Sequence, residues 1–264
     1  MTFLSNMTHA AEWGHWYTRD GKPCYEVPYA DPSKGMRSAT LKDAKRLGLV
    51  PGVTTIIQGA AKPGLERWKV TQGILSALTL PRLPDESLDA FADRAMLDSR
   101  EQARKAAERG TAIHAAIQGH YEGVSPDEPL LAYVQATVKT VDEEFPPARK
   151  WQSEASFASP LGFGGKTDLC MNNEEYAVVL DFKTKEFADT DKKLAWDEQC
   201  IQLAAYREGL LMPSARCANV YVSVNNPGLV RVHEWPEVEL QRGWKMFQAL
   251  MDYFYARTGL ARIA

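Results

Sequence analysis

Two aspartates and a lysine are the residues of this sequence whose types and spacing best suit chemistry. Asp181 follows Asp168 by thirteen residues, and only Phe182 separates Asp181 from Lys183. Side chains alternate between the faces of a strand, so Asp181 and Lys183 would point the same way. The apolar run Tyr-Ala-Val-Val-Leu before Asp181 predicts a buried strand. Charged groups at the end of such a strand are costly unless they meet a ligand or each other.

A divalent metal site would explain this arrangement. A short turn at residues 171–174 predicts a hairpin that places Asp168 beside Asp181. Adjacent carboxylates repel each other, and Mg²⁺ or Mn²⁺ relieves the repulsion because both ions prefer oxygen ligands. A lysine nearby can position and help deprotonate a water, or neutralise a phosphate. The alternative is a surface ion pair at two strand ends, since motifs this short recur by chance.

Three other residues could complete the site. His114 lies one turn into a predicted helix that starts at Gly110-Thr111, where an imidazole can serve as a further metal ligand. Gln202 and Tyr206 are four residues apart in a predicted helix and therefore share one face. An amide and a phenol facing a metal can bind phosphate or sugar. The alternatives are a packed or surface histidine and a solvent-facing polar pair.

The first half of the chain predicts mostly helices. A hairpin is expected over 15–29 around Asp20-Gly21, and Thr40 with Asp43 has the form of a capping box. A short helix would follow Thr54 or Thr55. The Ala-, Glu- and Arg-rich stretch 85–109 predicts a long helix, which Gly110 is expected to interrupt before a second helix begins.

The second half predicts an α/β module. Its expected order is helix, three strands, helix, two strands, helix. The ranges are a helix at 127–145, strands at 151–159, 162–171 and 175–185, a helix at 192–212, strands at 216–224 and 229–235, and a helix at 237–257.

Composition narrows the class of protein. The 264 residues are 45% hydrophobic and carry a formal net charge of −3, which excludes a histone-like basic coat but allows a local basic groove. The four cysteines form no CxxC pair, so we expect reduced, inert thiols. No apolar run approaches the roughly 18–20 residues that span a membrane, and the first residues do not resemble a signal peptide. We therefore expect a cytoplasmic protein that does not contact membranes.

Four motifs, in order, resemble the RecB-type nucleases of the PD-(D/E)XK superfamily. They are Gly110…His114, GGKTD ending at Asp168, DFK at 181–183, and QLAAY from Gln202 to Tyr206. Residues 51–69 are also similar to a stretch of mitochondrial genome maintenance exonuclease and its phage relatives, with Gly52 where those proteins usually have Ser. The resemblance covers about 51 to 206.

The resemblance implies a fold and an activity. The fold would be an α/β, restriction-endonuclease-like core, a central mixed sheet flanked by helices, with a helical N-terminal elaboration. Residues 1–264 would form a single nuclease domain, with the elaboration at 1–126 and the core at 127–264. The activity would be that of a metal-dependent deoxyribonuclease using one or two Mg²⁺ or Mn²⁺ ions. The implied ligands are His114, Asp168, Asp181 and the Phe182 carbonyl, with Lys183 as the catalytic lysine.

The resemblance also implies contacts with DNA. Gln202 and Tyr206 would orient the DNA, and Glu154 would support the metal ligands or have a structural role. Lys166 stands where the relatives often have a small residue; because it shares a strand face with Asp168, we expect it to contact a phosphate, and we also expect Lys185 to contact the DNA. Candidates for base stacking are Trp68, Tyr121 and Trp196, each equally compatible with a place in the core. The helix at 85–109 would form an arch over the site or be a solvated charged helix.

Several functions remain open at this point. We expect an exonuclease acting on single-stranded DNA ends in a bacterial or phage-infected cell, in the context of DNA repair, replication or recombination proteins. The alternatives are an endonuclease on duplex or branched DNA and a DNA-binding protein that does not cut. A P-loop is excluded because Pro160 occupies the position of its first glycine. No iron–sulfur cluster is expected from Cys24, Cys170, Cys200 and Cys217, which are widely spaced.

Overall fold

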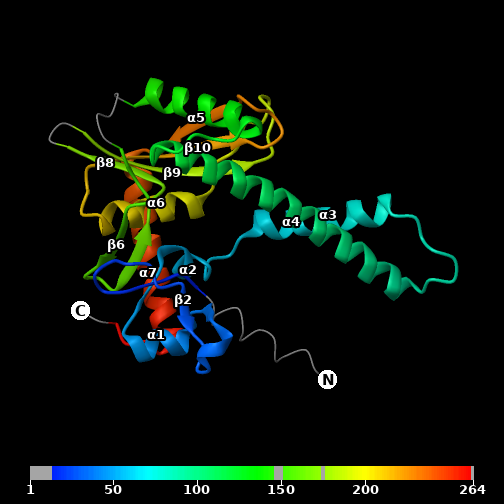
Figure 1. Ribbon diagram of the computed structural model, residues 1–264, viewed down its shortest axis with the longest axis horizontal. Helices are drawn as coiled ribbons and strands as arrows, with labels where there is room; N and C mark the ends of the chain where they lie inside the picture. Colours follow the sequence, from blue (N-terminus) through cyan, green and yellow to red (C-terminus); the bar gives the residue numbers. More distant parts are fainter. Residues whose placement is uncertain (1–13, 146–150, 174–175, 263–264) are drawn as a thin grey trace.

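The centre of the molecule is a five-stranded mixed sheet (Figure 1). The computed structural model describes residues 14–145, 151–173 and 176–262. The strand order is β11-β10-β9-β8-β5, in which β9 and β10 run parallel and the other neighbours antiparallel. The strands are β5 (Gln152–Ser153), β8 (Leu169–Asn172), β9 (Ala177–Lys185), β10 (Arg216–Ser223) and β11 (Val230–Glu234). The expected α/β class and the hairpin of β8 with β9 are confirmed.

Helices cover both faces of this sheet. On one face, α5 (Leu131–Glu144) and the end of α4 (Leu88–Tyr121) bury the even-numbered side chains of β9, Leu180 and Phe182 among them. On the other face, α6 (Asp197–Gly209) packs on the sheet, and α7 (Glu237–Thr258) packs on α6. Asp181 and Lys183 have odd numbers and therefore lie on the α6 face. The predicted helix at 237–257 is confirmed, and its apolar stripe lies in the core.

Each of two predicted strands is divided into two shorter strands, and the two points of division are hydrogen-bonded to each other. Residues 151–159 form β5 and β6 (Ser156–Ser159), and residues 162–171 form β7 (Phe163–Lys166) and β8. β6 pairs with β7 in a separate two-stranded sheet. Backbone hydrogen bonds hold the break, from the Glu154 N–H to the Asp168 carbonyl and from the Thr167 N–H to the Ala155 carbonyl. Asp168 thus lies where the chain passes from the two-stranded sheet into the central sheet.

The N-terminal hairpin prediction is only partly correct. The turn exists, with the Gly21 N–H bonded to the Thr18 carbonyl. However, β1 (Trp16–Tyr17) pairs mainly with β4 (Val50–Pro51), and β2 (Glu26–Pro28) pairs with β3 (Met36–Ser38). The fully buried ring of Trp16 explains the exchange, because it packs into the core, whereas Tyr17 still contacts Tyr25 across the local turn with ring centroids 5.7 Å apart. The short helices are α1 (Leu41–Leu47), whose predicted capping box is confirmed, α2 (Val53–Ile57), which starts before Thr54, and the one-turn η2 (Pro32–Lys34) and η3 (Glu128–Leu130).

A helical arm projects from the body (Figure 1). It consists of α3 (Pro63–Thr79), which the sequence does not predict, and the first half of α4. The second half of α4 lies on the sheet, so one helix connects the arm to the site. The predicted interruption at Gly110 is wrong, because α4 runs unbroken through it. A Cβ there would lie 2.7 Å from Thr184 Oγ1, so this glycine allows α4 to approach β9 closely.

None of the helices in the described ranges is both long enough and apolar enough to cross a membrane.

Candidate active site

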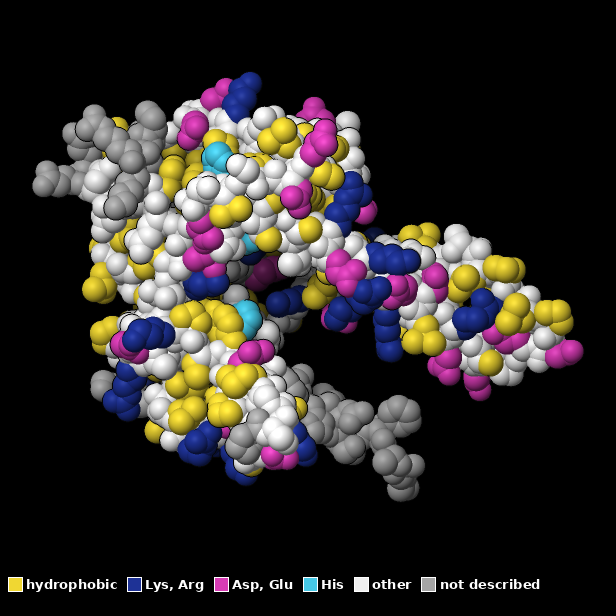
Figure 2. All heavy atoms as spheres, in the orientation of Figure 1, with side chains coloured by type: hydrophobic (Ala, Val, Ile, Leu, Met, Phe, Trp, Pro, Cys, Tyr) yellow, Lys and Arg dark blue, Asp and Glu magenta, His cyan; other side chains and the backbone are white. Residues whose placement is uncertain are grey.

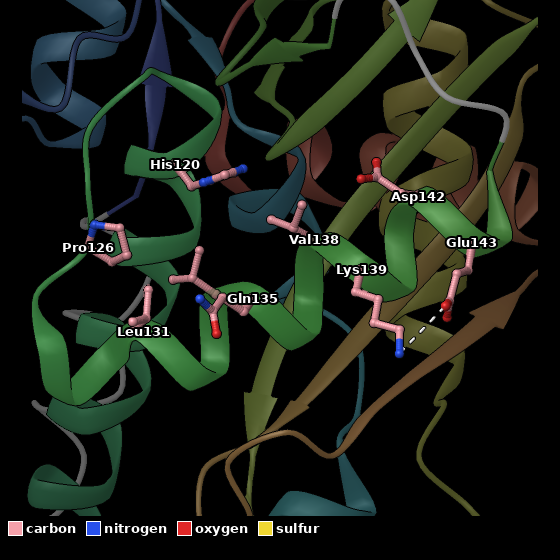
Figure 3. A pocket seen from close by; sticks show the side chains of 9 residues that line it. His120, Pro126, Leu131, Gln135, Val138, Lys139, Asp142 and Glu143 are labelled. Carbon is pink, nitrogen blue, oxygen red and sulfur yellow. Dashed lines mark ion pairs between the residues drawn. The ribbon is translucent and has the colours of Figure 1, made fainter.

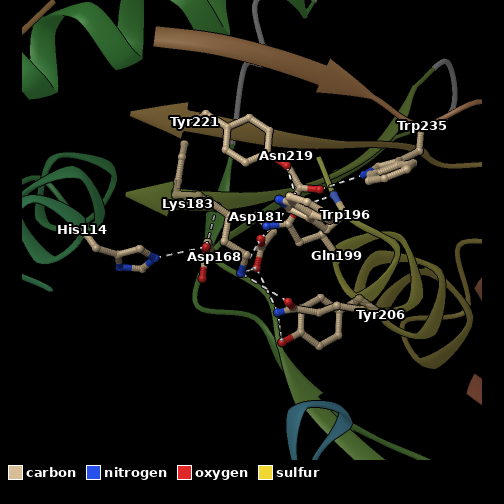
Figure 4. Close-up of polar contacts among 12 residues, drawn as sticks. His114, Asp168, Asp181, Lys183, Trp196, Gln199, Tyr206, Asn219, Tyr221 and Trp235 are labelled. Carbon is tan, nitrogen blue, oxygen red and sulfur yellow. Dashed lines mark hydrogen bonds and ion pairs between the residues drawn. The ribbon is translucent and has the colours of Figure 1, made fainter. Parts of the chain in front are cut away.

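Asp168 and His114 form the first half of the site. Asp168 stands at the bend between β7 and β8, and His114 reaches it from α4. Their Nε2 and Oδ2 atoms are 3.1 Å apart, and the same Oδ2 accepts a hydrogen bond from the Phe182 N–H at 2.7 Å. The Asp168 carboxylate raises the pKa of His114, because the hydrogen bond and charge attraction outweigh the effect of burial. The structure thus brings His114 and Asp168, two of the predicted metal ligands, into direct contact (Figure 4).

Asp181 forms the other half and is surrounded by donors. The residue is only 2% exposed. Gln202 Nε2 donates to Oδ1 at 2.9 Å, Asn219 Nδ2 donates to Oδ2 at 2.7 Å, and Lys183 Nζ lies 2.7 Å from Oδ2. Burial and the nearby Asp168 charge raise the pKa of Asp181, while Lys183 opposes this increase. At this carboxylate the effect of burial therefore outweighs the attraction of the adjacent Lys183 charge.

Lys183 links Asp181 to the helix behind it. Its ammonium group also donates to Gln202 Oε1 at 3.2 Å, and Gln202 Nε2 donates to the Tyr206 hydroxyl at 2.9 Å. Burial acts to lower the pKa of Lys183, but Asp181 and Asp168 hold it above its ordinary value, so the side chain stays charged. Burial raises the pKa of Tyr206 well above its usual range. Gln202 and Tyr206 thus lie on one face of α6, as their spacing predicts, and Gln202 contacts Asp181.

The donor set fits a hard divalent cation in its chemistry. Two carboxylates, an imidazole and the Phe182 carbonyl are the kinds of ligand that Mg²⁺ and Mn²⁺ accept. Within the ranges that the structure describes, however, no three His, Cys, Asp or Glu side chains are gathered as a metal site. Both oxygens of Asp181 accept hydrogen bonds, from Lys183, Gln202 and Asn219, and these contacts fix the orientation of the carboxylate.

The remaining predicted DNA contacts lie around this centre with partners of their own. Lys166, at the end of β7, forms an ion pair with Glu154. The backbone φ of Glu154 is 54°, at the bend between β5 and β6. Lys185 donates to the Leu194 carbonyl at 2.8 Å and lies over the Tyr221 ring. Among the described residues, neither lysine forms a hydrogen bond or ion pair with Asp168 or Asp181. Their role toward DNA stays a prediction.

The aromatic candidates for base stacking are not equivalent. Tyr121 stacks on Phe182 with ring centroids 6.2 Å apart, so its ring is part of the packing beneath the site. Trp68 is 46% exposed on the arm, and Trp196 is 40% exposed beside Lys193.

The arm extends outward and does not cover the site, and Arg94 and Arg104 form ion pairs within it (Figure 1).

The space-filling view shows a hollow between the part of the molecule that carries α4 and α5 and the part that carries α1, α2 and β2 (Figure 2). An acidic side chain lies deep in this hollow, with histidine and basic (Lys or Arg) side chains near its rim. A separate groove of about 570 Å³ lies between the end of α4 and α5, lined in part by His120, Leu131 and Val138 (Figure 3). None of the predicted site residues lines that groove.

Sequence reasoning missed three residues around the site. Asn219 and Trp235 stand behind Asp181, with the Trp235 indole donating to Asn219 Oδ1 at 2.7 Å. His15 stacks on Tyr25 at a centroid distance of 4.5 Å, and burial followed by the Lys166 charge lowers its pKa. Asn219 alone had a visible signal, as a polar residue inside the apolar strand Cys-Ala-Asn-Val-Tyr.

Comparison with known proteins gives limited information. No protein-family model matches the chain, and no curated protein matches it. Among solved structures, the chain is similar to a proposed exonuclease from Eubacterium rectale, with 14% identity over 57% of this chain and 68% of that one, at a TM-score of 0.43. It is also similar to the protein SSO0001, with 12% identity over 70% of this chain and 86% of that one, at a TM-score of 0.32. Both TM-scores lie below 0.5, a level at which likeness assigns neither fold nor function.

Proposed function

We propose that this chain is a metal-dependent deoxyribonuclease of the PD-(D/E)XK type, which hydrolyses DNA phosphodiester bonds. The observation that carries the proposal is the contact set of Asp181. The buried Asp181 carboxylate on β9 contacts Lys183. Asp168 immediately precedes the neighbouring strand β8 and pairs with His114. A merely structural ion pair does not need a second carboxylate and an imidazole beside it.

The ligands for Mg²⁺ or Mn²⁺, as one ion or two, would be His114, Asp168, Asp181 and the Phe182 carbonyl. A cation held there would lower the pKa of a water and stabilise negative charge on the phosphate oxygens. In the hydrolysis the water oxygen bonds to phosphorus and the bond from phosphorus to the leaving oxygen breaks. The water loses one proton, and the leaving oxygen gains one.

The chain's own residues would then position the reacting groups. Lys183 stays protonated beside Asp181, so its ammonium orients the water or offsets the charge that develops on the phosphate. Gln202 holds Lys183 and Asp181 at a fixed separation through its two amide atoms. The hollow of Figure 2 would admit a single DNA strand, and we infer that the substrate is a single-stranded end.

A digest of end-labelled DNA tests the proposal. Single- and double-stranded oligonucleotides, labelled at the 5′ or the 3′ end, are incubated with Mg²⁺, Mn²⁺ or EDTA. We expect degradation that requires the metal, with a product ladder that starts from one end of single strands. Internal cuts in duplex or branched DNA would instead assign an endonuclease.

Variants connect the activity to the site. Asp181→Ala should abolish cleavage while the protein remains folded, and Lys183→Ala should bind metal and DNA but cleave very slowly. Asp252→Ala, which removes an exposed carboxylate on α7, is the matched control and should cleave like the wild type. Cleavage by Asp181→Ala above background would refute the site. DNA binding without cleavage by the wild type would identify a protein that does not cut.

A further inference from the structure

A buried asparagine lies directly beside Asp181 in the sheet. In the parallel pairing of β9 with β10, Asn219 is the register partner of Asp181. Asn219 is fully buried, and Trp235, the residue after β11, is 6% exposed. The backbone N–H of Trp235 donates to the Cys217 carbonyl at 2.9 Å, so the base of the indole is fixed to β10. Figure 4 shows the chain of contacts from Trp235 through Asn219 to Asp181.

The hydrogen-bond chemistry of tryptophan fixes which way the asparagine amide points. An indole N–H can only donate, so the atom that Trp235 Nε1 contacts at 2.7 Å must be the amide oxygen of Asn219. The amide NH₂ then faces Asp181 and donates to Oδ2 at 2.7 Å. In the opposite orientation the NH₂ would face the indole N–H and the amide oxygen would face the carboxylate, and both contacts would be repulsive.

This contact differs from the others on Asp181. Gln202 and Lys183 approach from the helix side and from the strand end, and Lys183 retains contact with solvent. Asn219 approaches from inside the sheet. Both Asn219 and Asp181 are buried there, so neither can replace their mutual hydrogen bond with one to water. Asp181 therefore has one oxygen held by a group that cannot move independently of the sheet.

We propose that Asn219 and Trp235 are positioning residues that hold the Asp181 carboxylate in the orientation in which it binds the metal. This inference rests on the proposed function. Residues that hydrogen-bond to a metal-binding group typically change metal affinity or activity by about 10–100-fold when they are replaced. Trp235 would act only through Asn219, because it fixes the amide and does not contact Asp181.

The experiment compares Asn219→Ala, Trp235→Phe and the double variant. The first readout is the dissociation constant for Mn²⁺ alone, measured by calorimetry on the full chain. The second is the rate of DNA cleavage at saturating Mn²⁺. The third is the NMR signal of the Trp235 indole N–H, whose exchange with solvent should quicken in Asn219→Ala because its acceptor is gone.

Two controls have comparable structural costs. Ser223→Ala removes another fully buried hydrogen bond from β10, the one to the Phe187 carbonyl, without touching Asp181. Trp244→Phe trims another largely packed tryptophan, which stacks on Phe247 in α7. Thermal melts show whether each variant is folded, and Trp235→Phe preserves most of the core volume if Asn219→Ala does not fold.

We expect Asn219→Ala to weaken Mn²⁺ binding by about 10–100-fold. Trp235→Phe should shift it in the same direction by a smaller factor, and the double variant should match Asn219→Ala. The controls should bind Mn²⁺ like the wild type. Unchanged Mn²⁺ binding in both folded single variants, or equal losses in the controls, would overturn the positioning role. A wild type that neither binds Mn²⁺ nor cleaves DNA would instead refute the proposed function, and the positioning role with it.

Discussion

His114 and Asp168 interact across two elements, and the interaction depends on protonation. His114 is partly buried, and the charged imidazole is favoured because it bonds to the Asp168 carboxylate. A histidine whose pKa is raised on folding binds more protons in the folded state than in the unfolded one. The stabilisation is therefore fully present below the unfolded pKa of about 6.5 and is lost as the pH rises through the folded pKa.

The pH dependence of stability should reveal this pair. In EDTA, the free energy of unfolding of His114→Gln should fall below that of the wild type by on the order of 1 kcal/mol at pH 5.5. The difference should shrink by pH 9, where the imidazole is neutral in both states. Urea unfolding at the two pH values measures it. His120→Gln, at an exposed position six residues further along α4, is the control for replacing a histidine by glutamine, and a constant difference for His114→Gln would contradict the pairing.

The sequence predicts some of these residue contacts and misses others for a physical reason. Asp181 and Lys183 share a face because strand geometry alternates side chains, and i,i+4 spacing does the same for Gln202 and Tyr206. Asn219 meets Asp181 only through the register of two parallel strands that α6 connects. No local pattern specifies that register, so the asparagine partner of Asp181 could not be predicted from the sequence.

At the scale of elements, α4 and β9 approach each other closely beside the candidate site. Glycine in a helix interior usually costs about 0.8–1.0 kcal/mol relative to alanine. Gly110 is nevertheless required where it is, because a Cβ would meet Thr184 Oγ1 at 2.7 Å. His114 lies one turn further along the same helix, so the distance between α4 and β9 also sets the distance from His114 to Asp168.

Gly110→Ala should therefore destabilise the protein and slow cleavage, despite the better helix propensity of alanine. Gly119→Ala is the matched control in the same helix, since its Cβ would meet only Val124 at an ordinary 3.5 Å, and it should be neutral or stabilising. Adding Thr184→Ala to Gly110→Ala removes the clashing hydroxyl and should recover much of both losses. Melting temperatures and cleavage rates test this, and a stabilised, fully active Gly110→Ala would refute the close-contact argument.

The elements differ in how far sequence specifies them. The buried strand before Asp181 and the amphipathic α7 follow from periodicity, and both are present. The bend that separates β5 from β6 and β7 from β8 is a tertiary feature, because it depends on bonds between two segments that are each locally strand-like. The sequence does not predict α3 because its apolar residues do not form one clear face. Many of them, such as Trp68, Ile74 and Leu78, are exposed in the structure.

At the scale of the whole molecule, attraction to DNA must be local. The formal net charge of −3 gives no general attraction to a polyanion. Any affinity must come from cations near the candidate site, and Lys166, two residues before Asp168, is one whose charge Glu154 partly offsets. A phosphate that contacts Lys166 would compete with Glu154 for the same ammonium group.

Replacing Glu154 and replacing Lys166 should change DNA affinity in opposite directions. In a Lys183→Ala background with Mg²⁺, where cleavage is slow, Glu154→Gln should tighten binding of a single-stranded oligonucleotide and Lys166→Gln should weaken it. Lys166→Gln should also reduce the slope of log affinity against log salt by about 0.7, the value for one lost phosphate contact on single strands. Lys245→Gln, at an exposed position on α7, is the control and should leave the slope unchanged. Anisotropy titrations from low to high KCl measure these slopes. Equal slopes for the Lys166 and Lys245 variants would place the DNA path elsewhere on the surface, because an ammonium group that contacts a phosphate must release counterions when the complex forms.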